Sequence, residues 1–202
     1  MQESELIAQL KDESTQSQAF SALIKKYQEQ VYWLIRKMVL SHDDANDVLQ
    51  NTFLHAWKGI KTFRGDAKFS TWLYRIAVNE TFTFLANAEL KNANNMTDLE
   101  DIMVQNLASD EYFEGDELQI KFQKAILSLP PKQRMVFNMK YFEDKKYEEM
   151  EEILGTSVGA LKASYHHAVK KIESYVLMED WINWTNNIKV FFDNALNLLQ
   201  KE

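Results

Sequence analysis

The sequence predicts an all-α protein built from two small helical domains, and three observations support this. Only 5 Gly and 2 Pro occur among the 202 residues, too few for the many turns of an antiparallel β protein. Apolar residues make up 46% of the chain, enough for real cores. Their spacing of three and four residues is helical, and it is interrupted near the middle. We expect domains at 1–92 and 118–178, a linker at 93–117 and a C-terminal helix at 179–202.

The N-terminal domain is predicted to be a bundle of three helices. The first follows an apolar stripe at Phe20, Leu23, Ile24, Tyr27, Val31, Leu34, Ile35 and Met38. Ser41 or Asp43 can cap the second, which repeats that spacing from Ala45 to Ile60. Ser70 and Thr71 can cap the third, which we expect to run from Trp72 toward Leu85.

The linker carries the acidity of the whole chain. The formal net charge is -7, yet residues 96–117 alone hold eight acids and no base. The segments on either side are close to neutral, with eleven acids and eleven bases in 1–95 and eleven acids and twelve bases in 118–202. A solvated tether is the simplest interpretation of such a segment.

The C-terminal domain is predicted to contain a helix-turn-helix. Helical spacing resumes at Leu118, and Pro131 suits the first position of a helix. Further on, a short helix ends at Leu154, Gly155 turns the chain, and Ser157 caps a second helix. The buried stripe of that second helix is expected at Val158, Leu161, Tyr165, Ala168 and Ile172.

The outward faces of the second helix are the first candidate DNA-binding surface. No acid occurs from Thr156 to Ile172 in an otherwise acidic chain, which favours contact with phosphates. The candidate residues are Lys162, Ser164, His166, His167, Lys170 and Lys171. The two histidines also fit an ordinary solvent-exposed surface.

Residues 63–79 form the second candidate surface. They contain three cations, four aromatic residues and a single acid, the combination expected of a surface that meets both phosphates and bases. Phe63, Phe69 and Leu73 fit a buried stripe, whereas Trp72 fits either the core or the surface. The candidate DNA-binding residues are Arg64, Lys68, Trp72, Tyr74, Arg75 and Asn79.

Composition argues against most enzyme chemistries. The absence of Cys removes thiolate metal sites, disulfides and Cys nucleophiles. The run His42-Asp43-Asp44 invites a metal-phosphohydrolase interpretation, but partner histidines at suitable spacing are missing and helix capping explains it. We therefore predict no catalytic residues, no metal and no cofactor. We find no leader-like or membrane-spanning segment, so we expect a cytoplasmic protein without membrane insertion.

Residues 44–79 and 129–172 together resemble bacterial RNA polymerase sigma factors of the extracytoplasmic-function (ECF) group. The first stretch, with "FRGD" followed by "TWLYRIA", resembles their second conserved region, and the second resembles the promoter-reading fourth region. The two matches occur in the family's order and at its separation. The segment "GALKASYHHAVKKI" looks most like sigma factors of the Bacteroidetes.

The resemblance implies partners and roles. The partners are core RNA polymerase, promoter DNA and an anti-sigma factor, and the free protein is expected to be a monomer. The segment Arg64–Asn79 would engage the promoter element near the start site and the unpaired strand, and the helix-turn-helix would read the distal element. Asp47, Gln50 and Asn51 would contact the clamp helices of the polymerase. The acidic linker would lie in a channel built for RNA.

The sequence departs from the family pattern at several positions. Many relatives have Asp and Arg where this chain has Thr83 and Ala86, and often Arg where it has Ser164, His167 and Val169. Fewer phosphate contacts predict weak DNA binding by the free protein.

Three other classes of function compete with the sigma-factor interpretation. A free-standing helix-turn-helix regulator would bind operator DNA as a dimer, but it leaves the 63–79 cluster unexplained. A helical adaptor would use the basic helix as a plain surface, and a helical phosphohydrolase lacks ligands. The tail at 179–202 has an amphipathic pattern; it either covers its own domain or locks the two domains together.

Overall fold

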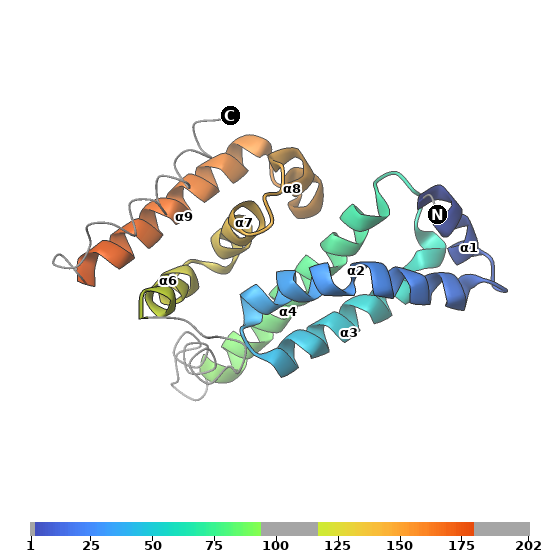
Figure 1. Cartoon of the computed structure of the whole chain (residues 1–202), viewed down its shortest axis with the longest axis horizontal. Helices are drawn as coiled ribbons and strands as arrows, with labels where there is room; N and C mark the ends of the chain where they lie inside the picture. The colour runs from blue at the N-terminus through green and yellow to red at the C-terminus, as the bar shows by residue number, and fades with distance from the viewer. Residues whose placement is uncertain (1–2, 94–116, 180–202) are drawn as a thin grey trace. The chain divides into compact units, whose positions relative to one another are not determined.

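The computed structural model describes residues 3–93 and 117–179, and within these ranges every regular element is a helix (Figure 1). The chain divides into two compact units, Met1–Leu99 and Glu100–Glu202. The all-α prediction is confirmed. The predicted linker and C-terminal helix lie almost entirely outside the described residues, so their exact bounds stay predictions.

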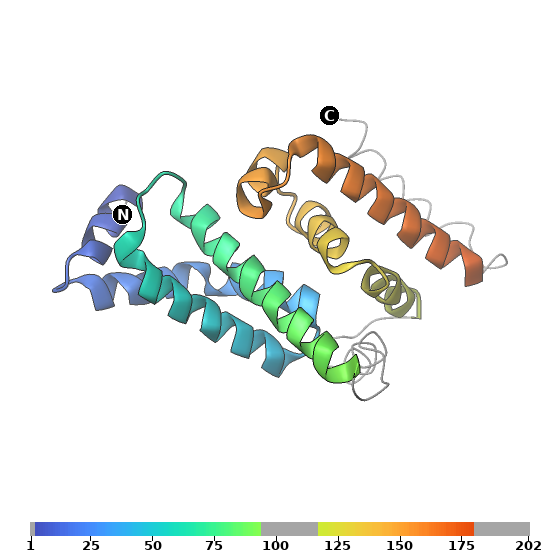
Figure 2. The same cartoon turned by 180° about the vertical axis from the view of Figure 1, so that it is seen from behind.

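The first unit is a bundle of three long helices with a short helix at one end. Helices α2 (Gln16–Val39), α3 (His42–Gly59) and α4 (Phe69–Ala93) pack on one another in pairs. Helix α1 (Glu3–Lys11) packs against α2 and against the 3-10 turn η1 (Ile60–Thr62), which follows α3 (Figures 1 and 2). The interior is apolar, with Leu23, Val31, Leu34, Ile35 and Met38 of α2 fully buried.

Local sequence signals explain where these helices begin and end. Leu40 stops α2 in a left-handed conformation with φ 60°, and its N–H donates to the carbonyl of Arg36 at 2.9 Å. The Ser41 hydroxyl then accepts from the N–H of Asp44 at 3.3 Å and caps α3, as predicted. Acidic Asp43 and Asp44 in the first turn complement the positive end of the helix dipole.

One predicted helix start in this unit was wrong, and one helix, α1, was not predicted. Helix α4 begins at Phe69, three residues before the predicted start, because the N–H of Trp72 already donates to the carbonyl of Lys68 at 3.1 Å. It runs toward Leu85 as predicted and continues to Ala93.

The second unit places three helices against a fourth. Helices α6 (Glu117–Leu127), α7 (Pro131–Tyr141) and α8 (Tyr147–Leu154) each pack on α9 (Val158–Glu179). Tyr165 of α9 is fully buried, and its ring stacks on Phe137 of α7 with centroids 5.8 Å apart. The central helix α9 thereby holds the unit together.

The helix-turn-helix prediction is confirmed in detail. Gly155 ends α8 with φ 64°, and its N–H donates to the carbonyl of Glu151 at 2.9 Å. The Ser157 hydroxyl accepts from the N–H of Ala160 at 3.4 Å and so caps α9. Along α9 the buried side chains are Leu161, Tyr165, Ala168, Val169, Ile172 and Val176. The predicted stripe is therefore right except at Val158, which is half-buried.

Candidate nucleic-acid interface

The loop of residues 64–68 is fixed at both ends by buried aromatic rings. Phe63 and Phe69 are 6% and 1% exposed, and their rings meet edge to face with centroids 5.7 Å apart. Between them the chain turns at Gly65, whose φ of 83° suits a residue without Cβ. Arg64 and Lys68 are exposed, and within the described residues neither is paired with a carboxylate. The fold therefore presents two free cations on a loop with fixed ends.

Four of the predicted DNA-binding residues form one stripe that begins at Lys68, the residue before α4, and continues along the helix. Lys68, Trp72, Arg75 and Asn79 are spaced by four, three and four residues, which is the spacing of one helix face. Lys68, Arg75 and Asn79 are exposed, and Trp72 is half-buried. The stripe therefore combines positive charge, an amide and one accessible ring on a rigid element.

Tyr74 was wrongly assigned to this surface. Its side chain is only 5% exposed. Two residues along an α-helix correspond to about 200° of rotation, so Tyr74 lies nearly opposite Trp72 and faces the core. The sequence prediction took the cluster of rings as one surface and did not separate the ring positions by helix face.

Trp72 belongs partly to the core and partly to the surface. Its ring packs against Phe63 and Phe69 with centroid distances of 5.1 and 5.3 Å. A Cβ atom placed on Gly59 would stand 3.1 Å from the indole atom Cζ2, so the glycine leaves room for the ring. The neighbouring rings fix the orientation of the indole while part of its surface stays accessible.

A separate polar stripe runs along α3. Asp47, Gln50 and Asn51 are all exposed and lie on one helix face. Leu54, which was not among the predicted contact residues, continues this stripe and is 48% exposed. Its position seven residues after Asp47 was the available signal. An exposed leucine within a polar stripe favours a protein partner over solvent.

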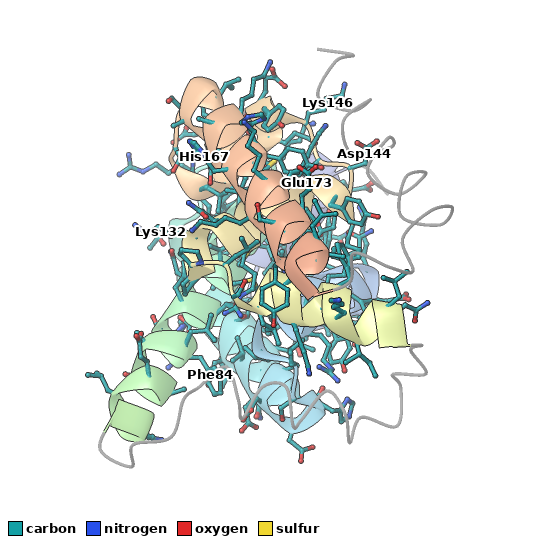
Figure 3. The ribbon with its side chains drawn as sticks, turned by 90° about the vertical axis from the view of Figure 1, so that its left-hand side faces the viewer. Phe84, Lys132, Asp144, Lys146, His167 and Glu173 are labelled. Carbon is teal, nitrogen blue, oxygen red and sulfur yellow. The ribbon has the colours of Figure 1, made fainter. Side chains whose placement is uncertain are left out.

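The exposed face of α9 is basic. Lys162, His167, Lys170 and Lys171 are exposed, whereas Ser164 and His166 are half-buried at its edges (His167 is labelled in Figure 3). The Lys162 ammonium lies 5.4 Å from the centroid of the Tyr147 ring, and that of Lys140 lies 5.1 Å from the same centroid. The aromatic side chain of α8 thus orients a cation of α9.

The outermost positions at the start of α9 are small. Gly159, Ala160 and Ala163 are exposed, and adding a Cβ at Gly159 would meet nothing within 4 Å. These three residues were not among the predicted DNA-binding residues because they carry no charge. The sequence comparison also counted Val169 among the positions at which relatives often have Arg. Its side chain is 3% exposed and belongs to the core.

Burial shifts the pKa values of two tyrosines behind this face. It raises the pKa of the Tyr165 phenol, and the nearby Tyr147, Tyr141 and Asp144 add to that direction. Burial also raises the pKa of Tyr141. The Tyr165 hydroxyl has no hydrogen-bond partner within the described residues. These groups stay neutral at physiological pH and serve packing.

The His42-Asp43-Asp44 run is engaged in structural contacts. His42 Nδ1 lies 2.8 Å from the Tyr32 hydroxyl, and Nε2 lies 3.0 Å from Nδ2 of Asn46. Both ring nitrogens therefore have partners. Among the described residues no three His, Asp or Glu side chains cluster as metal ligands, and no helix is long and apolar enough to cross a bilayer.

Two distinct surfaces thus suit nucleic acid, and a third suits a protein. A helix-turn-helix with a basic face, joined in one chain to a helical bundle that carries cations and a half-buried indole on one side, is typical of a DNA-binding protein.

Comparison with known families identifies the family to which this DNA-binding protein belongs. The family model described as Sigma-70 region 2 matches residues 23–89, and the model described as Sigma-70, region 4 matches residues 119–172. The chain therefore belongs to the sigma-70 family.

Curated relatives assign the chain to a group within that family. It is 31% identical over 156 residues to the ECF RNA polymerase sigma factor SigW of Bacillus subtilis, covering 73% of this chain and 83% of that protein. It is 30% identical over 168 residues to the ECF RNA polymerase sigma-E factor of Escherichia coli, covering 78% and 86%. The chain is an ECF sigma factor, which recognises promoters for RNA polymerase.

Solved structures share its fold. CnrH, solved in complex with the cytosolic domain of CnrY, has a TM-score of 0.63 at 20% identity, covering 88% of this chain and 99% of that one. RpoE of Bartonella quintana, solved with the anti-sigma factor NepR, has a TM-score of 0.59 at 19% identity, covering 80% and 98%. The ECF prediction is confirmed, while the likeness to Bacteroidetes proteins stays a prediction.

Proposed function

We propose that this sigma factor directs core RNA polymerase to promoters through three separate surfaces, each with its own partner. The α4 stripe with the 64–68 loop binds the promoter element near the start site, α9 binds the distal element, and the α3 stripe binds the polymerase. The stripe of Lys68, Trp72, Arg75 and Asn79 carries this proposal, because it supplies a ring for a base and cations for the backbone.

Energetics explain why the protein needs the polymerase. Stacking one base on an aromatic ring is worth roughly 1–3 kcal/mol. Opening about a dozen base-pair steps at ~1.4 kcal/mol each costs on the order of 15 kcal/mol. Trp72 is the one ring of the α4 stripe that is even partly accessible. It can hold a base that has left the stack, but the remaining free energy must come from core polymerase.

The α3 stripe is the docking surface for core polymerase in this proposal. Asp47, Gln50 and Asn51 supply polar contacts at exposed positions of α3. Leu54 lies among them and would be desolvated on docking. An apolar residue surrounded by polar ones matches the composition of protein–protein interfaces.

Helix α9 is the reading helix for duplex DNA. In a helix-turn-helix the second helix enters the major groove with its N-terminal residues toward the bases. Here those residues are Gly159, Ala160 and Ala163, while the cations follow at Lys162, His167, Lys170 and Lys171. The cations position the helix on phosphates, and the small residues permit close approach. Bidentate Arg–guanine contacts are missing from this face, which favours weak binding by the free protein.

An anti-sigma factor is a further proposed partner. The two similar solved structures are complexes, one with the cytosolic domain of CnrY and one with the anti-sigma factor NepR. By that likeness we expect a protein that covers the docking surfaces of this chain. We expect the sigma factor itself to act in the cytoplasm as a non-enzymatic initiation subunit and to be a monomer when free.

Reconstitution with core polymerase tests the proposed function. We expect specific run-off transcripts from a subset of promoters, and promoter affinity at least tenfold higher with core polymerase than without it. Equally tight promoter binding with and without core polymerase would contradict the proposal and favour a free-standing operator-binding dimer.

A further inference from the structure

Helix α1 contacts the segment that leads into the 64–68 loop. Leu10 of α1 is fully buried, and α1 packs against both α2 and η1. The junction after it is well bonded: the Thr15 hydroxyl donates to the carbonyl of Gln9 at 2.8 Å. Asp12 Oδ1 accepts from the N–H and hydroxyl of Ser14 at 2.9 and 2.8 Å. Helix α1 is therefore held in one position on the bundle.

The turn η1 connects this helix to the aromatic cluster. The Thr62 hydroxyl donates to the carbonyl of Gly59 at 2.8 Å, and the N–H of Phe63 donates to the carbonyl of Ile60 at 3.2 Å. Ile60 is 1% exposed. A 3-10 turn this short has little stability by itself, so its geometry depends on what packs around it.

An ion pair links the α1 side to η1 directly. Lys61 Nζ of η1 lies 3.0 Å from Glu13 Oε1, in the turn after α1. Both side chains are well exposed, so the pair contributes to orientation more than to stability. The next residues after η1 are Phe63, whose ring contacts Trp72, and then Arg64. A shift of η1 would therefore move the ring cluster and the first cation of the loop together.

We propose that α1 is a supporting helix for promoter recognition: it fixes η1 and thereby the placement of the 64–68 loop and of Trp72. Leu10, the fully buried side chain of α1, is its positioning residue; it acts through η1 and touches no DNA. This inference rests on the proposed function of the loop and stripe. A helix that merely covered the core would affect stability, whereas a supporting helix also affects discrimination at the proximal element.

The test compares two truncations of leucine in the full-length protein bound to core polymerase. Leu10→Ala alters the supporting helix. Leu34→Ala is the matched control, because Leu34 is also fully buried but lies about 27 Å along α2 from Gln16, at 1.5 Å per residue. For each holoenzyme, affinity is measured for bubble DNA with a native or a scrambled proximal element, and for duplex DNA with a native or a scrambled distal element. Circular dichroism identifies a temperature at which both variants are folded.

We expect Leu10→Ala to reduce the native-to-scrambled affinity ratio at the proximal element at least threefold, with the distal ratio and core affinity unchanged. Leu34→Ala should change neither ratio. Equal loss in both variants, or loss in neither, would overturn the supporting role. If Leu10→Ala does not fold, Leu10→Val takes its place in the same comparison. A wild-type holoenzyme with no proximal discrimination would instead overturn the proposed function itself, and the inference with it.

Charge exchange gives an independent readout. Glu13→Lys should lower the proximal ratio by about twofold, and adding Lys61→Glu should restore it, because the exchanged pair can form again. Thermal stability is measured alongside. A ratio that stays low in the double variant, or one that never falls in the single variant, would contradict a positioning role for this contact.

Discussion

The two proposed DNA-binding surfaces differ in where they carry aromatic side chains. On the first unit the indole of Trp72 lies partly at the surface, with Lys68 and Arg75 on the same side and Arg64 on the adjoining loop. On the second unit the rings of Tyr147 in α8 and Tyr165 in α9 are buried, and the exposed face of α9 offers cations and small residues. The overall charge of either surface would not reveal this difference.

That contrast corresponds to two forms of DNA. Bases in a duplex are covered by their neighbours, so a ring at the surface has nothing to stack on, and a slim basic helix fits the groove. Unpaired bases expose their faces and reward an accessible ring. The position of the rings therefore predicts which surface binds the unpaired strand.

The largest effect is expected from a substitution that weakens binding to core polymerase, because both proposed DNA-binding surfaces depend on the polymerase. Asp47→Arg reverses a charge in the α3 stripe, so we expect at least a tenfold loss of affinity for core polymerase and a parallel loss of promoter opening. Glu29→Arg, at an exposed position of α2, is the matched charge reversal and should leave core affinity unchanged. Affinity is measured by fluorescence anisotropy. An unaffected Asp47→Arg variant would remove α3 from the docking surface.

The next effect separates the surfaces by their rings. Trp72→Leu keeps apolar packing against Phe63 but removes the stacking face. Affinity of the holoenzyme for bubble DNA should fall about tenfold, as roughly 1–3 kcal/mol of stacking is lost. Binding of distal-element duplex should not change. Phe84→Leu is the control, because it removes a half-buried ring of α4 outside the stripe (Figure 3). Equal loss in both variants would indicate damage to packing rather than lost stacking.

A smaller effect separates them by polar contacts. Arg75→Ala with Asn79→Ala should impair capture of the unpaired strand by about threefold to tenfold, and Lys162→Ala with His167→Ala should impair distal recognition by a similar factor. Each cation that contacts a phosphate contributes about one unit to the salt slope. Permanganate footprints of open complexes distinguish the two steps. If both pairs change the same step, the division of roles is wrong.

The smallest expected effect concerns Tyr165, whose ring is buried on the inner face of α9. Tyr165→Phe removes a hydroxyl that has no hydrogen-bond partner within the described residues, so stability at pH 7 should be unchanged or slightly higher. Burial raises the folded-state pKa of Tyr165, so above the unfolded pKa of about 10 the unfolded chain loses this proton first, and the free energy of unfolding falls as the pH rises. Thermal unfolding at pH 7 and above pH 10 should show a smaller alkaline loss in the variant. An equal loss would contradict this cause.

The sequence predicted most of this architecture because helical spacing is a local property. The stripe of α2, the cap at Ser41 and the turn at Gly155 all depend on residues within one or two turns of each other. Helix α1 was missed although Leu6, Ile7 and Leu10 have helical spacing, because a helix of nine residues is too short to be stable alone. Its stability depends on packing against η1, some fifty residues later, and a local pattern does not reveal such long-range packing.

The candidate site was predicted less completely, for a related reason. Residue type selected Lys68, Arg75 and Asn79, which are exposed, but the direction of a side chain depends on which face of the helix meets the core. Tyr74 was misplaced because its ring is equally suited to core and surface. Leu54 was missed because only polar residues of α3 were considered for the docking surface, although Leu54 continues the exposed stripe.

The loop between Phe63 and Phe69 has a consequence for how such proteins diverge. Its two buried flanking rings belong to the core, whereas Arg64, Asp66 and Lys68 are exposed and Gly65 is constrained by its backbone alone. If the loop binds promoters as proposed, substitutions at its exposed positions change the choice of promoter and leave the packing of the core intact. After a gene duplication, two copies with such a loop would then acquire different target genes while the bundle that carries it is preserved.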